Sequence, residues 1–278
     1  MELEKAIGLG VAGNFAGHLK QAGEAADFAH LRITDENSPK GVFPFYLPGA
    51  PGHRLGQFPV SHDRIVLPEG GGNVQIEPEV ALICDLVYEG KKVSAVVPRR
   101  FAAYNDCSIR RPGARKISEK KNWGISTKGL SRDWIDIDRF ARGGVMDSYR
   151  IASYLYRDGR LHTYGIDSPV LGYGYFYEGL QRWLVEKLNS QQDEGPLECI
   201  GDLLALAQWP RWAVISAGAT RYTEFGETNF LVPGDESIVV VYDGVRQDHR
   251  DIEAMLTGGG RAGPSDGISV LRQKVAGG

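Results

Sequence analysis

The sequence predicts an α+β fold that is mainly β, with one catalytic-type domain over residues 1–256 and a flexible C-terminal tail over 257–278. Two observations carry this prediction. Extended segments come first along the chain, helical patterns appear late, and extended segments follow again, unlike the regular alternation of a doubly wound sheet. Glycine is frequent, at 36 of 278 residues, which favours tight turns and a loop-rich site.

The N-terminal half supplies most of the expected strands. In chain order they cover 4–10, 42–47, 64–67, 74–86, 92–98 and 101–110, with a short helix over 14–23 after the first. The segment VQIEPEVALICDL at 74–86 is the strongest, because its apolar and β-branched residues follow a cluster of turn-forming ones.

The C-terminal half adds a hairpin, two helices and two strands. Asp158-Gly159 between 149–156 and 160–164 is typical of a two-residue hairpin turn. Helical periodicity covers 176–188 and 197–207, and the strands cover 213–216 and 237–242. The linker-like composition of TGGGRAGPSDG at 257–267 predicts that the C-terminal residues after it are flexible.

Composition excludes some classes of partner. The formal net charge of −3 gives no electrostatic argument for binding nucleic acid or an anionic membrane. No apolar run is long enough to span a bilayer. Three widely spaced cysteines without a C-x-x-C motif suit a reducing compartment, and no secretory leader is recognisable, so we expect a cytoplasmic protein.

The segment GLGVAG at 8–13 matches the G-x-G-x-x-G pattern of dinucleotide-binding turns. A dinucleotide fold also needs further helices, and residues 36–75 are rich in proline and glycine without helical periodicity. A dinucleotide-binding protein is therefore kept as an alternative only.

Three carboxylates form a candidate metal site. Glu77 and Glu79 are two apart on an apolar strand and so point to one face, and Asp106 lies in the next strong extended segment. Hard divalent cations take such oxygen ligands. From spacing alone, solvated acids at an exposed strand start remain the alternative. Residues 91–132 hold twelve Lys or Arg and two acids, which suits a small anionic substrate or a solvated loop.

The order of motifs resembles the fumarylacetoacetate hydrolase superfamily. The matching segments are GNFAGH at 13–18, FPFYLP at 43–48, DRIVLP at 63–68, EPEVALI at 77–83, NDCSIR at 105–110, KNW at 121–123, SAGAT at 216–220 and PGD at 233–235. The resemblance runs from about residue 8 to 245, and it favours a tight turn ahead of His18 over a pyrophosphate cradle.

The resemblance implies a mixed β-sandwich roll of the type found in the C-terminal domain of that family, and a homodimer. It implies Mg²⁺ or Mn²⁺ held by Glu77, Glu79 and Asp106, and a small anionic 2-oxo or diketo acid that reacts through a metal-bound enolate. The reaction is a tautomerisation, decarboxylation, hydration or C–C hydrolysis. The implied catalytic residues are His18 and Lys121, and the implied substrate-binding residues are Arg110, Gln21 and Thr220.

The chain departs from the family pattern at several positions. Gln21 stands where hydrolytic members carry a glutamate that pairs with the histidine, and Leu47 replaces a lysine. Ala219 replaces a threonine, with Thr220 one place late, and an insertion at 24–41 stands where a lid would lie. These departures keep open a non-catalytic member that binds a metal and a small anion.

Overall fold

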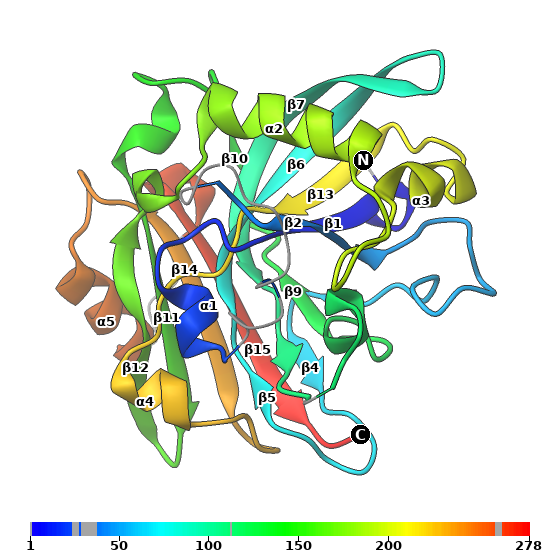
Figure 1. The fold of residues 1–278 in the computed structure, drawn as a ribbon. Helices are drawn as coiled ribbons and strands as arrows, with labels where there is room; N and C mark the ends of the chain where they lie inside the picture. The colour runs from blue at the N-terminus through cyan, green and yellow to red at the C-terminus, as the bar shows by residue number, and fades with distance from the viewer. Residues whose placement is uncertain (1, 24–27, 29–37, 112, 259–262) are drawn as a thin grey trace.

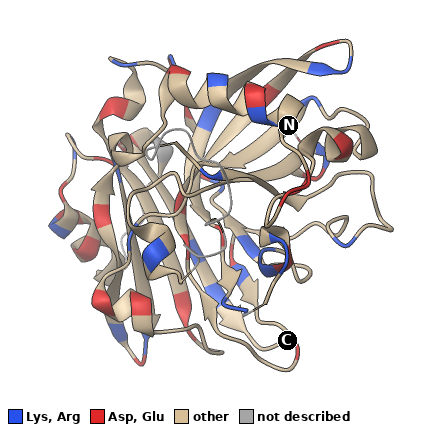
Figure 2. Ribbon diagram, in the orientation of Figure 1, with Lys and Arg blue, Asp and Glu red and all other residues tan. Residues whose placement is uncertain are grey.

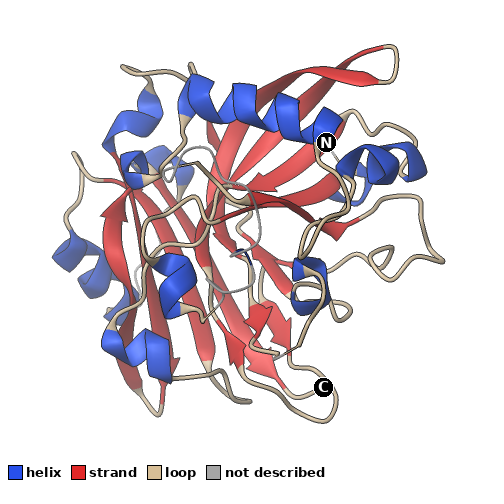
Figure 3. Ribbon diagram, viewed as in Figure 1, coloured by secondary structure: helices blue, strands red, loops and turns tan. Residues whose placement is uncertain are grey.

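The computed structural model describes residues 2–23, 28, 38–111, 113–258 and 263–278. Strands dominate, and the short helices lie around two curled sheets (Figure 3). The eight-stranded sheet runs in the order β2 (Gly41–Tyr46), β1 (Ile7–Ala12), β13 (Trp212–Ser216), β6 (Pro78–Glu89), β7 (Lys92–Asn105), β9 (Lys128–Leu130) and β3 (Val60–Ser61), and β10 (Ile135–Asp136) pairs with β7.

The second sheet has five strands, in the order β12 (Arg160–Pro169), β11 (Tyr149–Arg157), β14 (Glu236–Asp243), β15 (Ile268–Ala276) and β4 (Arg64–Val66). A small sheet pairs β5 (Val74–Gln75) with β8 (Ser108–Ile109). The α-helices are α1 (His18–Gln21), α2 (Tyr177–Ser190), α3 (Ile200–Leu206), α4 (Glu224–Thr228) and α5 (His249–Thr257). This architecture confirms the α+β, mainly β prediction.

The main core lies between the two large sheets. Leu82 of β6 and Phe101 of β7 pack in one buried cluster with Ile151 of β11 and Val239 of β14. Helix α2 lies across β7 and β6 and adds its apolar side chains, including Leu184, to the same cluster (Figure 1). The two sheets and α2 therefore share one hydrophobic core.

The other face of the eight-stranded sheet carries a second apolar cluster, which includes Ala81, Tyr104 and Phe45. Side chains alternate between the faces of a strand, so Glu79, two residues before Ala81, points to this outer face. The candidate site is therefore built at one end of the outer face, away from the core between the sheets.

The longest strand contains a proline. We expected two strands over 92–98 and 101–110, and the structure joins most of them in β7. Pro98 pairs with Cys84 at a register shift between Ile83 and Cys84. A bulge tolerates proline inside a sheet because one ladder hydrogen bond is already missing there.

The structure corrects part of the flexible tail expected over 257–278, namely residues 268–276. Residues 268–276 form β15, which pairs with β14 on one side and with β4 on the other. Leu271, Gln273 and Val275 are buried while Arg272 and Lys274 are exposed, so the strand has the alternation of a half-buried sheet position. The glycine-rich segment before it masked this pattern.

Charged residues of both signs are interspersed over the ribbon (Figure 2). Much of the basic run at 91–132 is paired: Arg99 binds Asp85 and Arg100 binds Asp136, each at 2.7 Å on the surface. None of the helices in the described part of the chain is long and apolar enough to cross a membrane.

Candidate metal centre

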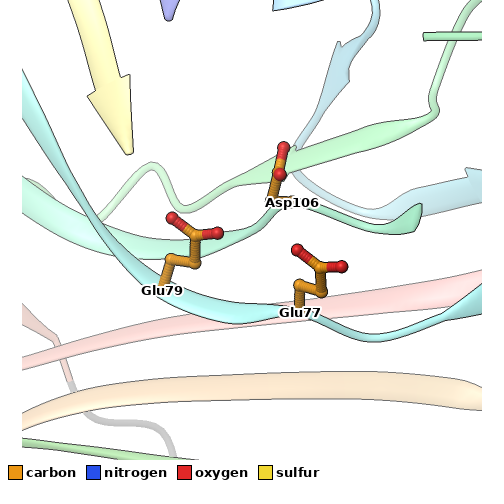
Figure 4. Close-up of side chains that lie close together, drawn as sticks. All are labelled: Glu77, Glu79 and Asp106. Atoms are coloured by element: carbon orange, nitrogen blue, oxygen red, sulfur yellow. The ribbon is translucent and has the colours of Figure 1, made fainter. Parts of the chain in front are cut away.

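Glu77, Glu79 and Asp106 converge at the start of β6 (Figure 4). Each offers an oxygen within 4.8 Å of the other two, and all three residues are buried. The pairing of β6 with β7 produces this arrangement, because Pro78 lies opposite Asn105, and the Asp106 amide donates to the Glu77 carbonyl at 2.9 Å. The structure thus brings together the three predicted ligands; that they bind a metal stays a prediction.

Three cations surround the carboxylates. Lys121 Nζ lies 2.6 Å from Glu77 Oε2 and 2.6 Å from Asp106 Oδ2. Arg110 Nη1 lies 2.8 Å from Glu77 Oε1, and Lys128 Nζ lies 3.2 Å from Asp106 Oδ1. Buried charges are costly unless they are paired, so these contacts allow Glu77 and Asp106 to be buried.

The cluster shifts its carboxylates in opposite directions. Burial alone would raise the pKa of Glu77, but Lys121, Arg110 and His18 outweigh it and hold that pKa well below the usual range. Burial, and then the Asp106 carboxylate, raise the pKa of Glu79 well above the usual range. Without a metal, Glu77 is therefore the ionised partner of the cations, while Glu79 holds its proton to a higher pH.

Lys128 was not predicted from the sequence. Its ammonium is fully buried and donates to the backbone carbonyls of Asp106, at 2.8 Å, and of Cys107. Burial lowers the pKa of Lys128. Its side chain reaches the site because β9 pairs with the end of β7, and no local sequence pattern predicts that pairing.

His18 lies at the same site. It begins α1, is buried, and lines a small hollow together with Glu77, Glu79 and Lys121. Its Nδ1 lies 2.9 Å from the Thr220 carbonyl oxygen. A carbonyl only accepts, so Nδ1 carries the proton and Nε2 is the ring atom that can accept one.

The segment 216–220 holds two parts of the site in place. The Gly218 amide donates to Glu79 Oε2 at 2.8 Å, and the Thr220 carbonyl fixes His18. The Thr220 hydroxyl donates to the Pro78 carbonyl at 3.4 Å, whereas Ala219 lines the hollow. The structure thus gives Thr220 a contact with β6; its role in substrate binding stays a prediction.

Gln21 contacts the backbone beside His18. Its Oε1 accepts from the Tyr222 amide at 3.0 Å, and its Nε2 donates to the Tyr222 carbonyl at 3.2 Å. The ring of Tyr222 meets the edge of His18, with centroids 5.2 Å apart. Gln21 therefore holds α1 against residue 222. Glu24 and the acids at 27–36, which are near His18 in sequence, lie outside the described residues.

Arg110 approaches Glu77 from the side of β5 and β8. Besides Glu77, it donates from Nε to Gln75 Oε1 at 2.6 Å and from Nη2 to the Tyr222 hydroxyl at 2.8 Å. Lys121 lines the hollow with the carboxylates and Arg110 does not. The expectation that both cations face one cavity holds for Lys121.

The glycines of GLGVAG have a packing role. Gly8 and Gly10 lie inside β1, and a Cβ at either would overlap the ring of Phe45 or Phe43 of the neighbouring β2. In a dinucleotide-binding unit these glycines form the turn between the strand and the helix. Here the strand continues to Ala12 and α1 begins at His18, which argues against the dinucleotide alternative.

Comparisons with known proteins agree with this fold. A family model described as a family of unknown function (DUF5718) matches residues 24–275. None of the curated proteins matches the sequence.

Several solved structures have a similar fold. The crystal structure of Cg1458 with inhibitor has a TM-score of 0.56 at 17% identity, covering 98% of this chain and 77% of that one. Yeast ynq8, a fumarylacetoacetate hydrolase family protein, has 0.54 at 13% identity, covering 99% and 95%. The 5-carboxymethyl-2-hydroxymuconate delta-isomerase from Mycobacterium smegmatis has 0.51 at 16%, covering 98% and 79%. These likenesses confirm the predicted fold.

Proposed function

The chain belongs to a family of unknown function (DUF5718) and has the fold of fumarylacetoacetate hydrolase proteins, and on this premise we propose that it is a divalent-metal-dependent enzyme acting on a small 2-oxo or diketo acid. The observation that carries the proposal is the buried set Glu77, Glu79 and Asp106, whose oxygens lie within 4.8 Å of one another.

The carboxylates fit a hard cation. Glu77 Oε1 and both Asp106 Oδ atoms are buried, and each has an ammonium or guanidinium group within 3.2 Å, so these oxygens lie in a place that suits a positive charge. Glu79 is aimed by the Gly218 amide, which leaves its other oxygen for a ligand. Three oxygen ligands of this kind suit Mg²⁺ or Mn²⁺. When bound, such a cation would supply Lewis-acid stabilisation of negative charge on the substrate oxygens.

The chain's own residues supply the proton chemistry. With Nδ1 committed to the Thr220 carbonyl, His18 Nε2 can take a proton from a substrate carbon or water in the hollow. Phe43 and Ala219 form apolar parts of the lining, which limits water at the reacting atoms. Lys121 places a positive charge at the same hollow, which suits an anionic substrate.

The neutral partner of His18 Nδ1 bears on the reaction class. Gln21 binds the Tyr222 backbone, and Nδ1 contacts the Thr220 carbonyl, which cannot stabilise an imidazolium by a full charge as a carboxylate would. We therefore favour reactions that need one proton transfer, such as tautomerisation or decarboxylation, over C–C hydrolysis, which needs an activated water.

The test is turnover with Mg²⁺ or Mn²⁺ on oxaloacetate and on an acylpyruvate, in wild type and in Glu79→Gln. We expect metal-dependent turnover that oxalate inhibits and that Glu79→Gln loses. Equal turnover with EDTA would refute the metal's role. Mn²⁺ and oxalate binding without turnover on any substrate would favour the non-catalytic binder. The homodimer belongs to the same proposal, and light scattering would detect it.

A further inference from the structure

One ammonium stands where two carboxylates would hold an ion. Lys121 Nζ bridges Glu77 Oε2 and Asp106 Oδ2 at 2.6 Å from each. A divalent ion shared by those oxygens would sit about 2.0–2.3 Å from them, and so in the same small volume as the ammonium. An ammonium and a divalent ion in the same small volume of a buried site repel each other strongly.

We propose that Lys121 and the divalent ion are alternative occupants of the acidic cluster. Without metal, the ammonium is the cluster's counter-cation; when metal binds, the ammonium leaves Glu77 and Asp106. This inference rests on the proposed function, because it presumes that the same carboxylates bind a metal.

The two neighbouring cations do not occupy the bridging position, because Arg110 contacts Glu77 and Lys128 contacts Asp106. Lys128 contacts Asp106 while it donates to two backbone carbonyls, and a buried ammonium that left them would lose those bonds. Arg110 is held by Gln75 and the Tyr222 hydroxyl in addition to Glu77. Among the described residues, Lys121 is the cation whose side chain bridges two of the three carboxylates.

The displaced ammonium has a place to go. Lys121 already lines the hollow beside His18, and its Nζ lies 5.1 Å from the centroid of the Phe43 ring. A flexible four-carbon stem can turn the ammonium away from the carboxylates and towards that ring and the hollow. Metal loading would then convert a counter-cation of the carboxylates into a cation that faces an anionic substrate.

The experiment compares Mn²⁺ affinity by calorimetry in wild type, Lys121→Met and Arg110→Met. Both variants remove one positive charge next to Glu77, but only the first clears the bridging position. We expect Lys121→Met to bind Mn²⁺ about tenfold more tightly or better, and Arg110→Met to change affinity much less. Thermal melts check folding, and Lys121→Gln, which keeps a polar group, replaces Lys121→Met if the latter does not fold.

A crystal structure with Mn²⁺ gives a second measurement. The ion is located by its anomalous scattering, and Lys121 Nζ is expected beyond hydrogen-bond distance of both Glu77 and Asp106. If Mn²⁺ binds while Nζ stays on both carboxylates, or if the two variants tighten binding alike, the inference is overturned and the metal function stands. If Lys121→Met binds Mn²⁺ and wild type does not, the inference is supported and the metal function of the natural chain fails. If none binds, both fail.

Discussion

Glu79→Gln and Asp106→Asn are expected to separate metal binding from stability. The raised pKa of Glu79, caused first by burial and then by Asp106, means that its carboxyl keeps a proton in the metal-free fold above the usual range. Glutamine has nearly the same shape as that neutral acid and can still accept from the Gly218 amide. We expect its cost near pH 6, in EDTA, to stay within about 1 kcal/mol.

Asp106→Asn removes the partner of two buried ammonium groups. Lys121 lies 2.6 Å and Lys128 3.2 Å from this carboxylate, and both are buried. Breaking a buried ion pair from one side costs about 3–5 kcal/mol. At roughly 2–4 °C per kcal/mol, the melting temperature should fall by about 6–20 °C. Calorimetric melts in EDTA measure both variants, and Mn²⁺ titration should show that both lose the metal. Equal destabilisation by the two substitutions would refute this account of which acid the buried ammonium groups depend on.

A comparison of wild type with Glu79→Gln tests the proton linkage of Glu79. A raised folded-state pKa means that the fold binds this proton more tightly than the unfolded chain does. Metal-free wild type should therefore lose stability relative to Glu79→Gln as pH rises from the ordinary carboxyl pKa towards the raised one, and the difference should level off above it. A difference that is constant with pH would contradict the direction of this shift.

Three further changes test the fold and the base. Gly10→Ala should destabilise the protein by about 1–3 kcal/mol in chemical denaturation, because its Cβ would overlap the Phe43 ring. Deletion of 268–278 should prevent cooperative thermal unfolding, because it removes a strand from inside the second sheet and leaves two edges unpaired. Gln21→Glu should raise the rate of acylpyruvate hydrolysis in a turnover assay, if a carboxylate at 21 strengthens His18 as a base. An unchanged rate would mean that the amide at 21 does not limit hydrolysis.

Local sequence pattern predicted those elements whose residues are typical of a single type of secondary structure. The Asp158-Gly159 turn was recognisable because a tight hairpin needs positive φ at both residues, and the structure gives 50° and 75°. Lys92–Asn105 appeared as two strands because proline and arginine interrupt its apolar pattern, and a bulge in the pairing with β6 resolves the interruption. Residues 268–276 were missed because composition before a strand says nothing about its partners.

In the candidate site, too, some contacts could be predicted from the sequence and others could not. The convergence of Glu77 and Glu79 follows from the two-residue period of a strand, and Asp106 joins them because it directly follows the strand paired with β6. The contact of His18 with the Thr220 carbonyl joins residues 202 apart in sequence, and the burial of Lys128 depends on the pairing of β9. Both depend on tertiary structure, so only the residue types, and not their contacts, could be inferred from the motifs.

Charge balance at the site favours a substrate with two negative charges. The charges of three ionised carboxylates and of the cations Lys121, Arg110 and Lys128 sum to zero. A bound dication therefore adds two uncompensated positive charges to a buried region. A dianion that chelates the ion restores neutrality, whereas a monoanion leaves one charge uncompensated. In the Mn²⁺-loaded protein we therefore expect oxalate to bind at least about tenfold more tightly than pyruvate, which chelates through the same kind of oxygens.

Because oxalate is also the better ligand of free Mn²⁺, the decisive comparison is the ratio of the two affinities in Arg110→Met. Loss of one positive charge should lower that ratio, and a ratio equal to that of wild type would show that the preference lies in the ion rather than in the chain.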